Sequence, residues 1–449
     1  MERIQETLDG FLDWLEREGK SVICYGASAM AEEALREDRL ASRVQYFVDS
    51  DTEKQGELVR LADRRFPVHS PAQLRQEDFS RTVLLITSGW FRTIMEELDH
   101  WPELAEAPCA AYPQLLIACA PDSEEFFRRR ILDECLREYE SVLENRGEPE
   151  PAQKWELLAE KRAYIQGNGP QDRPLVIPRV MILPTTRCNL RCKGCSSLLP
   201  LFERPVDLPA GQLIRDLDLF FRGVDQCIRL TIGGEPFLYP ELVELLAYLR
   251  AQDKILGVLL ITNSTIQPGG SVLELLKDPK FYVEVSDYGH IRQMSRTVAA
   301  LESAGVRFSV LADQVWDDMG GVEPRGRTAE QQREVYCLCE QSRLMKSIHN
   351  GAVYTCARSA RMRALACGYS SERDYFVLNE GETIECLREK IRGLYYMDTA
   401  DACDRCDLGR LPAKKIPAGV QLAGHWERSA YTLVKRDEYE ALKAAGKKK

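Results

Sequence analysis

The chain has 449 residues, 15 cysteines and a formal net charge of −10. This length exceeds one compact core, so two or three domains are expected, and the acidic balance argues against nucleic acid as the main substrate. The cysteines are odd in number and mostly scattered in apolar runs, which excludes a disulfide framework and indicates a reducing compartment. With no basic-then-apolar signal and no run near the roughly twenty apolar residues of a membrane span, we expect a cytoplasmic protein without a membrane partner.

Residues 1–120 predict a Rossmann-like α/β domain, similar to modules fused to enzymes of surface-sugar and secondary-metabolite assembly. Residues 21–28 read as a strand and turn, and the next strand ends at Asp49, where a ribose-binding carboxylate is expected. The glycine fingerprint is degenerate, because Gly26 is present but Ser28 replaces a glycine and would crowd a pyrophosphate. NAD is therefore expected to bind weakly or not at all. Binding of a nucleotide or substrate carrier, and a structural or docking role, stay open.

Residues 121–175 predict a helical linker. Apolar side chains recur at helical spacing from Phe126 to Leu143, which is typical of one amphipathic helix that packs on a core. Stretches rich in glycine and proline at residues 147–151 and 167–170 then interrupt the chain before the next strand.

Three cysteines follow an apolar strand over residues 180–183, at a place where a βα barrel carries its reactive groups. These are Cys188, Cys192 and Cys195, called the cysteine triplet below. A cubane cluster has four irons, so three thiolates from one loop leave the fourth iron open to a substrate or cofactor. A closed zinc site would need four ligands, and no fourth Cys or His lies nearby in the sequence. A structural zinc loop remains the alternative.

The spacing of the triplet resembles the radical S-adenosylmethionine (SAM) superfamily, and the likeness extends over residues 176–325. A strand over residues 228–232 runs into Gly233, Gly234, Glu235 and Pro236, which in that family bind the methionine end of SAM. Adjacent glycines allow close backbone approach, and a carboxylate accepts from an ammonium; an ordinary turn is the alternative. The resemblance implies an α/β fold with a partial (β/α)6 TIM-like barrel and a SAM-binding four-iron cluster.

Polar residues at the ends of two further expected strands extend the resemblance. It implies that Asn263 and Ser286 hydrogen-bond the ribose and carboxylate of SAM, while capping and turn formation are the alternative. Many family members place an aromatic residue just before the third cysteine to contact adenine. Here that residue is Gly194, so another group is expected to hold adenine.

Residues 326–410 contain a second group of cysteines, which resembles the twitch extension, the short form of the SPASM domain. Gly351 is expected to form the turn of a hairpin whose second strand leads to a ligand cysteine. Either Cys337 or Cys339 fits the motif, and Cys339 is favoured because residues 342–348 then lead straight into the turn. A zinc ribbon is the alternative. The implied ligands of an auxiliary four-iron cluster, called the auxiliary set below, are Cys339, Cys356, Cys403 and Cys406.

The resemblance implies that a flavodoxin- or ferredoxin-type reductant drives cleavage of SAM to a 5′-deoxyadenosyl radical, which takes hydrogen from a small-molecule substrate. The extension favours an oxidoreductase acting on a sugar, nucleotide-linked sugar or cyclitol alcohol, with Asp287 as base; a turn or a SAM contact suits Asp287 equally. Epimerisation with Cys337 as hydrogen donor, and peptide modification, are the alternatives. Residues 411–449 are a tail without a chemical motif.

Overall fold

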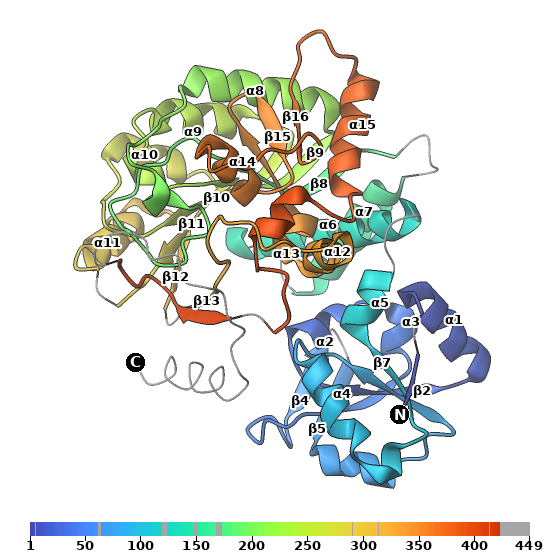
Figure 1. Cartoon of the computed structure of the whole chain (residues 1–449). Helices are drawn as coiled ribbons and strands as arrows, with labels where there is room; N and C mark the ends of the chain where they lie inside the picture. Colours follow the sequence, from blue (N-terminus) through green and yellow to red (C-terminus); the bar gives the residue numbers. More distant parts are fainter. Residues whose placement is uncertain are drawn as a thin grey trace. The chain divides into compact units, whose positions relative to one another are not determined.

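The computed structural model describes residues 1–4, 6–61, 64–118, 124–147, 151–167, 173–289, 291–312, 314–412 and 414–422. The chain divides into two compact units. Unit 1 comprises Met1–Ser123 with Arg410–Ala413, and unit 2 comprises Glu124–Gly409 with Lys414–Lys449. Figure 1 labels the elements of both units.

Unit 1 is built on a seven-stranded sheet with the order β1-β7-β6-β2-β3-β5-β4. All neighbouring strands run parallel except β4, which is antiparallel to β5. Apart from the two-residue strand β1, the parallel strands β5-β3-β2-β6-β7, numbered along the chain, stand in the order 3-2-1-4-5, which is typical of a doubly wound sheet. The strands are β1 (Glu2–Arg3), β2 (Ser21–Tyr25), β3 (Val44–Val48), β4 (Leu58–Leu61), β5 (Arg64–His69), β6 (Thr82–Ile86) and β7 (Pro108–Ala111).

The helices of unit 1 pack on a core that includes Ile23, Leu84 and Phe91. Leu411 packs against the same core and its carbonyl accepts from Arg92, so the short segment after residue 409 belongs to this unit. The helices are α1 (Leu8–Glu18), α2 (Ala29–Ala34), α3 (Asp38–Ala41), α4 (Phe91–Asp99) and α5 (Tyr112–Ala118), with 3-10 turns η1 (Pro71–Gln76) and η2 (Pro102–Leu104).

Unit 2 begins with α6 (Glu124–Arg146) and α7 (Pro151–Gln166). The helix expected in the linker is present as α6, although the side chains of Phe126 and its neighbours lie outside the described part. Cys135 and Val142 of α6 are buried against Val176 and Ile228 of the following sheet. The predicted linker helix is therefore part of the core of unit 2.

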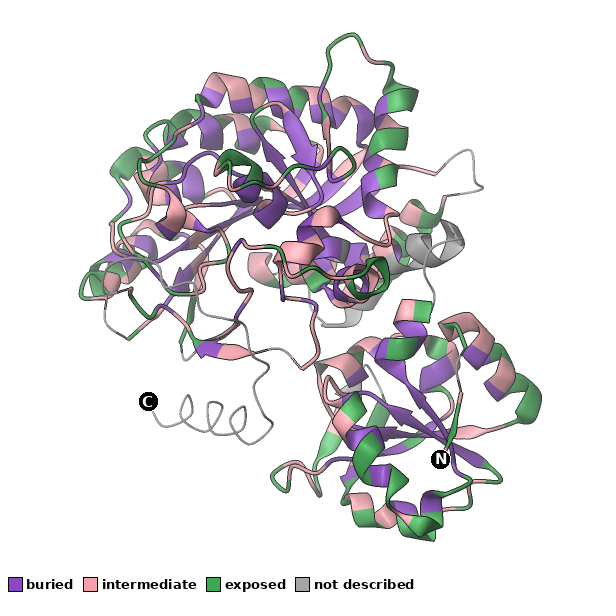
Figure 2. Ribbon diagram, viewed as in Figure 1, coloured by how far each residue is buried: buried purple, intermediate pink, exposed green. Residues whose placement is uncertain are grey.

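The sheet of unit 2 has eight strands in the order β12-β11-β10-β9-β8-β14-β15-β16. Strands β8 to β12 are parallel, and β14 adds a sixth parallel strand beside β8. Their apolar residues are buried, as Figure 2 shows in purple. The predicted α/β class with a partial parallel barrel is confirmed; the sheet is open. The strands are β8 (Val176–Ile182), β9 (Gln226–Ile232), β10 (Ile255–Thr262), β11 (Phe281–Ser286), β12 (Phe308–Leu311), β14 (Met345–His349), β15 (Ala352–Tyr354) and β16 (Tyr375–Val377).

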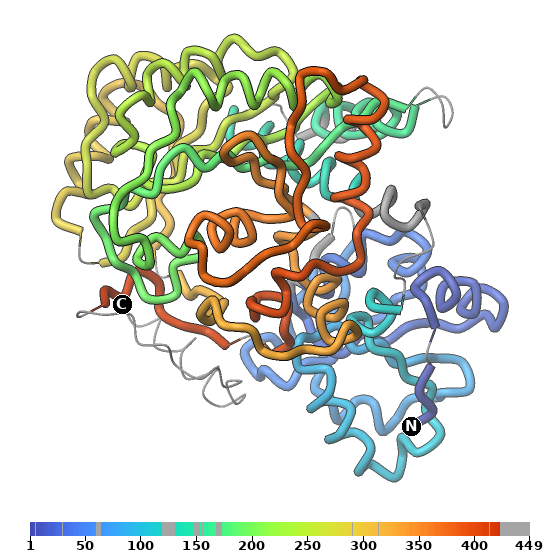
Figure 3. Tube along the Cα trace, turned by 45° about the horizontal axis from the view of Figure 1, so that its top comes forward, coloured from blue at the N-terminus to red at the C-terminus, as the bar shows by residue number. Residues whose placement is uncertain are grey.

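The helices of unit 2 connect its strands and form the stretch that carries the auxiliary set. Figure 3 traces this stretch in orange and red beside the green and yellow barrel. The helices are α8 (Ala210–Gly223), α9 (Leu242–Ala251), α10 (Gly270–Leu276), α11 (Met294–Ala304), α12 (Ala329–Leu338), α13 (Glu340–Leu344), α14 (Ala357–Ala364) and α15 (Ile384–Tyr395), with 3-10 turns η3 (Leu199–Leu201), η4 (Pro236–Leu238) and η5 (Asp401–Arg405). Strands β13 (Val315–Asp317) and β17 (Lys415–Pro417) form a separate pair.

The predicted hairpin around Gly351 is present as β14 and β15. Asn350 and Gly351 both have positive φ, 48° and 76°, as two-residue primed turns require. The amide of Gly351 donates to the Asp216 carboxylate at 2.8 Å, which fixes the turn against α8. Within the ranges that the structure describes, no helix has the length and apolar character needed to cross a bilayer.

Candidate active site with two sets of cysteines

The cysteine triplet lies on the loop after β8, which Asp207 holds in place. Its carboxylate pairs with Arg187 at 2.8 Å and accepts from the Thr185 hydroxyl at 2.6 Å. The three thiols are close enough to interact electrostatically, and burial raises the pKa of Cys188 to about 12 and that of Cys192 to about 11. Buried thiols of this kind become thiolates when they ligate a metal.

A cubane cluster and a single metal ion need different arrangements of thiols. Among the described residues, no three His, Cys, Asp or Glu side chains are placed to hold one metal ion. A zinc ion gathers its ligands into one coordination sphere, whereas a cubane binds each thiolate through a different iron and so holds the thiolates farther apart.

Side-chain amides point at two of the three sulfurs. Asn263 Nδ2 lies 3.4 Å from Cys188 Sγ, and Gln421 Nε2 lies 3.2 Å from Cys192 Sγ. Such donors stabilise an anionic sulfur, and hydrogen bonds to cluster sulfurs tune the reduction potential. Asn263 also lies 3.4 Å from the Asn189 side chain. The role of Asn263 in binding SAM stays a prediction, and Gln421 is a residue that the sequence did not indicate.

The glycines before Glu235 have a packing role, and their expected role in binding SAM stays a prediction. A Cβ on Gly234, whose φ is 90°, would lie 2.7 Å from the Thr185 carbonyl oxygen. A Cβ on Gly233 would lie 2.7 Å from the Leu183 side chain. In this structure the two glycines allow the turn to pack closely against β8 and the loop of the triplet. The chain then enters the 3-10 turn η4 at Pro236.

Glu235 is buried between the ends of β9 and β10. Its carboxylate accepts at 2.8 Å from both the Thr262 hydroxyl and the Asn263 amide. Burial nevertheless raises the pKa of Glu235 to about 7, because desolvation disfavours the charged form more than these bonds favour it. An incoming ammonium would restore the charged form, as the predicted SAM contact requires.

The end of β11 carries Ser286, Asp287 and Tyr288. Ser286 is buried, whereas the Asp287 carboxylate accepts from the Gly289 amide at 2.8 Å and closes a turn. The Tyr288 ring stacks edge-on against Trp316 at 5.6 Å between centroids. Burial raises the pKa of Tyr288, and the nearby triplet thiols add to the rise. Tyr288 is thus an aromatic group near the triplet that the sequence analysis did not single out.

The segment around β17 lies along the triplet loop, although the sequence analysis assigned it no function. The Lys193 amide donates to the Val420 carbonyl at 2.7 Å, and the Leu422 amide donates to Arg191 at 2.8 Å. The Ile416 side chain occupies the space that any Cβ on Gly194 would need. The glycine that replaces the family's aromatic residue is therefore required for this packing.

The auxiliary set lines one cavity of about 230 Å³. The Cys403 thiol interacts electrostatically with the other three thiols. The cavity is also lined by Met181, Thr231 and Ile261 of the barrel strands. Cys337 is not among its lining residues, and its thiol lies 3.6 Å from the Asp398 carbonyl oxygen. The geometry thus favours Cys339 over Cys337 as the cluster ligand.

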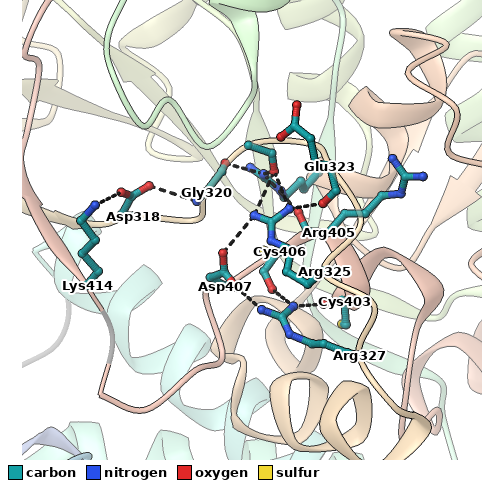
Figure 4. A network of polar contacts seen from close by, with 12 residues as sticks. Asp318, Gly320, Glu323, Arg325, Arg327, Cys403, Arg405, Cys406, Asp407 and Lys414 are labelled. Carbon is teal, nitrogen blue, oxygen red and sulfur yellow. Dashed lines mark hydrogen bonds and ion pairs between the residues drawn. The ribbon is translucent and has the colours of Figure 1, made fainter. Parts of the chain in front are cut away.

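Charged contacts fix the loop that carries Cys403 and Cys406. Figure 4 shows the fully buried Asp407 between Arg325, at 2.9 Å, and Arg327. Arg327 also donates to the Cys403 carbonyl and, at 2.6 Å, to the Cys406 carbonyl. The position of the two cysteines therefore depends on one carboxylate and two guanidinium groups.

Helix α14 connects the two sets of cysteines. Cys356 is its N-cap, and the sulfur accepts from the Ser359 amide at 3.4 Å. Farther along, Arg361 is fully buried, donates to the Thr185 carbonyl at 2.6 Å and interacts with the thiol of Cys195. Burial lowers the pKa of Arg361 to about 10, so it remains charged.

Asp49 and Ser28 of unit 1, the two residues singled out for nucleotide binding, both have partners within the unit. The Asp49 carboxylate accepts from the Ala27 amide at 2.8 Å and from Lys54 at 3.0 Å. The Ser28 hydroxyl donates to the Thr87 carbonyl at 2.7 Å across the two central strands. These contacts occupy the groups that would bind a ribose and a pyrophosphate.

A cysteine triplet at the carboxyl edge of a parallel sheet, beside a buried carboxylate, defines a cluster-dependent enzyme site. Residues 182–286 match the family model described as "Radical SAM superfamily", so this part of the chain is a radical SAM domain. The family uses a four-iron cluster and SAM, and the donors around the triplet fit such a group. Residues 1–104 match the model described as "C-methyltransferase C-terminal domain".

Comparisons with individual proteins cover parts of the chain. GTP 3′,8-cyclase of Helicobacter pylori (strain HPAG1) is 34% identical over 90 residues, which is 20% of this chain and 28% of that protein. BtrN in complex with AdoMet and 2-DOIA is 16% identical with a TM-score of 0.36, over 51% of this chain and 93% of BtrN. Streptococcus suis SuiB bound to S-adenosylmethionine is 15% identical with a TM-score of 0.25, over 36% and 38%.

Proposed function

We propose that this protein is a radical SAM oxidoreductase that converts a small alcohol, of sugar or cyclitol type, into a ketone. The observation that carries the proposal is the single cavity shared by the auxiliary set and by barrel residues Met181, Thr231 and Ile261. A substrate held at the barrel end of that cavity would lie next to an electron acceptor held by the auxiliary set. Oxidation needs such an acceptor, whereas a redox-neutral reaction does not.

When bound, the cluster of the triplet with SAM would supply the radical that removes a hydrogen atom from the substrate carbon, and a cluster at the auxiliary set would accept the remaining electron. In this proposal Glu235 accepts from the SAM ammonium, while Asn263 and Ser286 bind its polar groups. Thr231 has a buried hydroxyl without a partner and lines the cavity, so it is suited to bind a substrate oxygen.

The proton of the alcohol must pass to a base. No carboxylate or imidazole lines the cavity in the described part of the chain, and Asp287 is outside its lining. We retain Asp287 as the proposed base because it follows β11, at the edge where a barrel presents reactive groups. The contact of its carboxylate with the Gly289 amide supports the alternative that Asp287 closes a turn, so the D287N variant is part of the test.

Two alternatives differ in what they need from the cavity. An epimerase needs a hydrogen donor facing the substrate, and Cys337, its candidate, is buried against the Asp398 carbonyl and outside the cavity lining. Peptide modification needs a long open groove that reaches the triplet. The position of Cys337 favours oxidation over epimerisation, and the substrate screen below distinguishes a small alcohol from a peptide.

The test is a screen of cyclitols and sugars deuterated at the carbinol carbon, with anaerobically reconstituted protein. We expect one SAM consumed per ketone formed, and deuterium transferred from the substrate to 5′-deoxyadenosine. D287N should slow ketone formation about a hundredfold or more, the loss typical of a missing general base. Solvent deuterium at the product carbon without net oxidation would favour the epimerase, and a C337A variant would then stop turnover.

A further inference from the structure

Arg361 is a buried cation without an anionic partner in the described structure. It lies on α14 with no exposed surface, and its Nη2 donates to the Thr185 carbonyl at 2.6 Å. Its Nε and Nη1 are buried and have no hydrogen-bond partner. None of the ion pairs between described residues involves it. A cation in this state is strongly unfavourable unless a negative group completes the site.

Three side chains lie near the guanidinium, and only one of them can carry a negative charge. The Phe202 ring lies 5.8 Å from it, and the imidazole of His349 bonds the Leu183 carbonyl at 3.1 Å. Burial lowers the pKa of His349 to about 4, so this ring is neutral. The remaining neighbour is the thiol of Cys195, the third member of the triplet, with which Arg361 interacts electrostatically.

We propose that Arg361 binds the anionic group assembled at the cysteine triplet, and that α14 thereby ties the auxiliary set to the SAM site. Two sources supply that charge: the thiolate-ligated cluster itself and the carboxylate of SAM. The inference rests on the assignment of the triplet as a cluster site. Cys356, a member of the auxiliary set, is the N-cap of the same helix, five positions before Arg361. One helix therefore carries a proposed ligand of the auxiliary cluster and the cation beside the triplet.

The test compares R361M and R361K with R363M in the full-length reconstituted protein. Arg363 is the matched control, because it lies on the same helix, is exposed and stacks on the Tyr375 ring at 4.1 Å. The readouts are iron content, the midpoint potential of the triplet cluster without SAM, and the dissociation constant of SAM. Wild-type protein shows independently whether a cluster forms and SAM binds, which tests the assignment on which the inference rests.

We expect R361M to weaken SAM binding at least tenfold or to lower the midpoint potential, with R361K close to wild type and R363M unchanged. A lower potential without SAM identifies the cluster as the anion, and weaker SAM binding at an unchanged potential identifies the carboxylate. Loss of the triplet iron in R361M but not in R361K supports the proposal as well. Equal iron loss in both variants, or R361M with wild-type iron, potential and affinity, overturns it.

Discussion

Replacing Asp407 with Asn should release the auxiliary iron while the triplet keeps its own. The carboxylate is fully buried between Arg325 and Arg327, and Asn keeps its shape but removes the negative charge that both guanidinium groups share. Removing one partner from a buried ion pair costs about 3–5 kcal/mol. Arg327 also bonds the carbonyls of Cys403 and Cys406, so the loss acts directly on the loop that carries these ligands.

The assay measures iron per chain after anaerobic reconstitution, together with guanidinium unfolding of the same samples. Wild-type protein should hold about eight irons and D407N about four, because each cubane contributes four. D401N is the control, since Asp401 forms a pair with Arg373 that is partly exposed, 39% and 49%, and such pairs contribute about 0–1 kcal/mol. If D407N retains both clusters and the wild-type unfolding midpoint, the network does not organise the auxiliary set.

Three further predictions concern the triplet, SAM and unit 1. Changing all three triplet cysteines to Ala should remove about half of the iron and abolish SAM cleavage. The C403A/C406A variant should keep the SAM-binding cluster. Wild-type protein that holds one cluster plus zinc would contradict the assignment of the auxiliary set to a second cluster. SAM affinity should fall by up to tenfold per pH unit below the pKa of Glu235, about 7, because the carboxyl group must lose a proton to accept from the ammonium. The E235Q variant should show a much weaker dependence of affinity on pH in calorimetry. NAD and NADP should not reach micromolar affinity in calorimetry, and S28G should not restore binding, because Lys54 still neutralises Asp49.

Much of the candidate site could be predicted from the sequence because the strongest motifs are short and local. The triplet, the turn before Glu235 and the hairpin at Gly351 each depend on a few adjacent residues whose types are dictated by ligation or by positive φ. Gln421 could not be predicted in the same way. It lies 229 positions after Cys192, in a segment without a motif, and only tertiary folding brings its amide to the sulfur.

Arg361 is a second residue whose position could not be predicted from the sequence. In the sequence it belongs to a helix with several arginines, where a charged side chain is normally exposed. Its burial follows from how α14 packs behind the hairpin onto the loop of the triplet. The role of the glycines before Glu235 is similar, because spacing indicated that a close approach was needed but not that the approaching group is the Thr185 backbone.

The two parallel sheets differ in a way that locates the chemistry. At the carboxyl edge of the unit 1 sheet, Ser28 and Asp49 have hydrogen-bond partners within the unit. At the corresponding edge in unit 2, buried polar atoms of Thr231, Ser264 and Arg361 have no partner. Because an unpaired buried polar atom is costly, a fold retains several together where a ligand completes them. This contrast supports the proposal that unit 2 binds the reacting groups, while weak or absent binding of NAD to unit 1 stays a prediction.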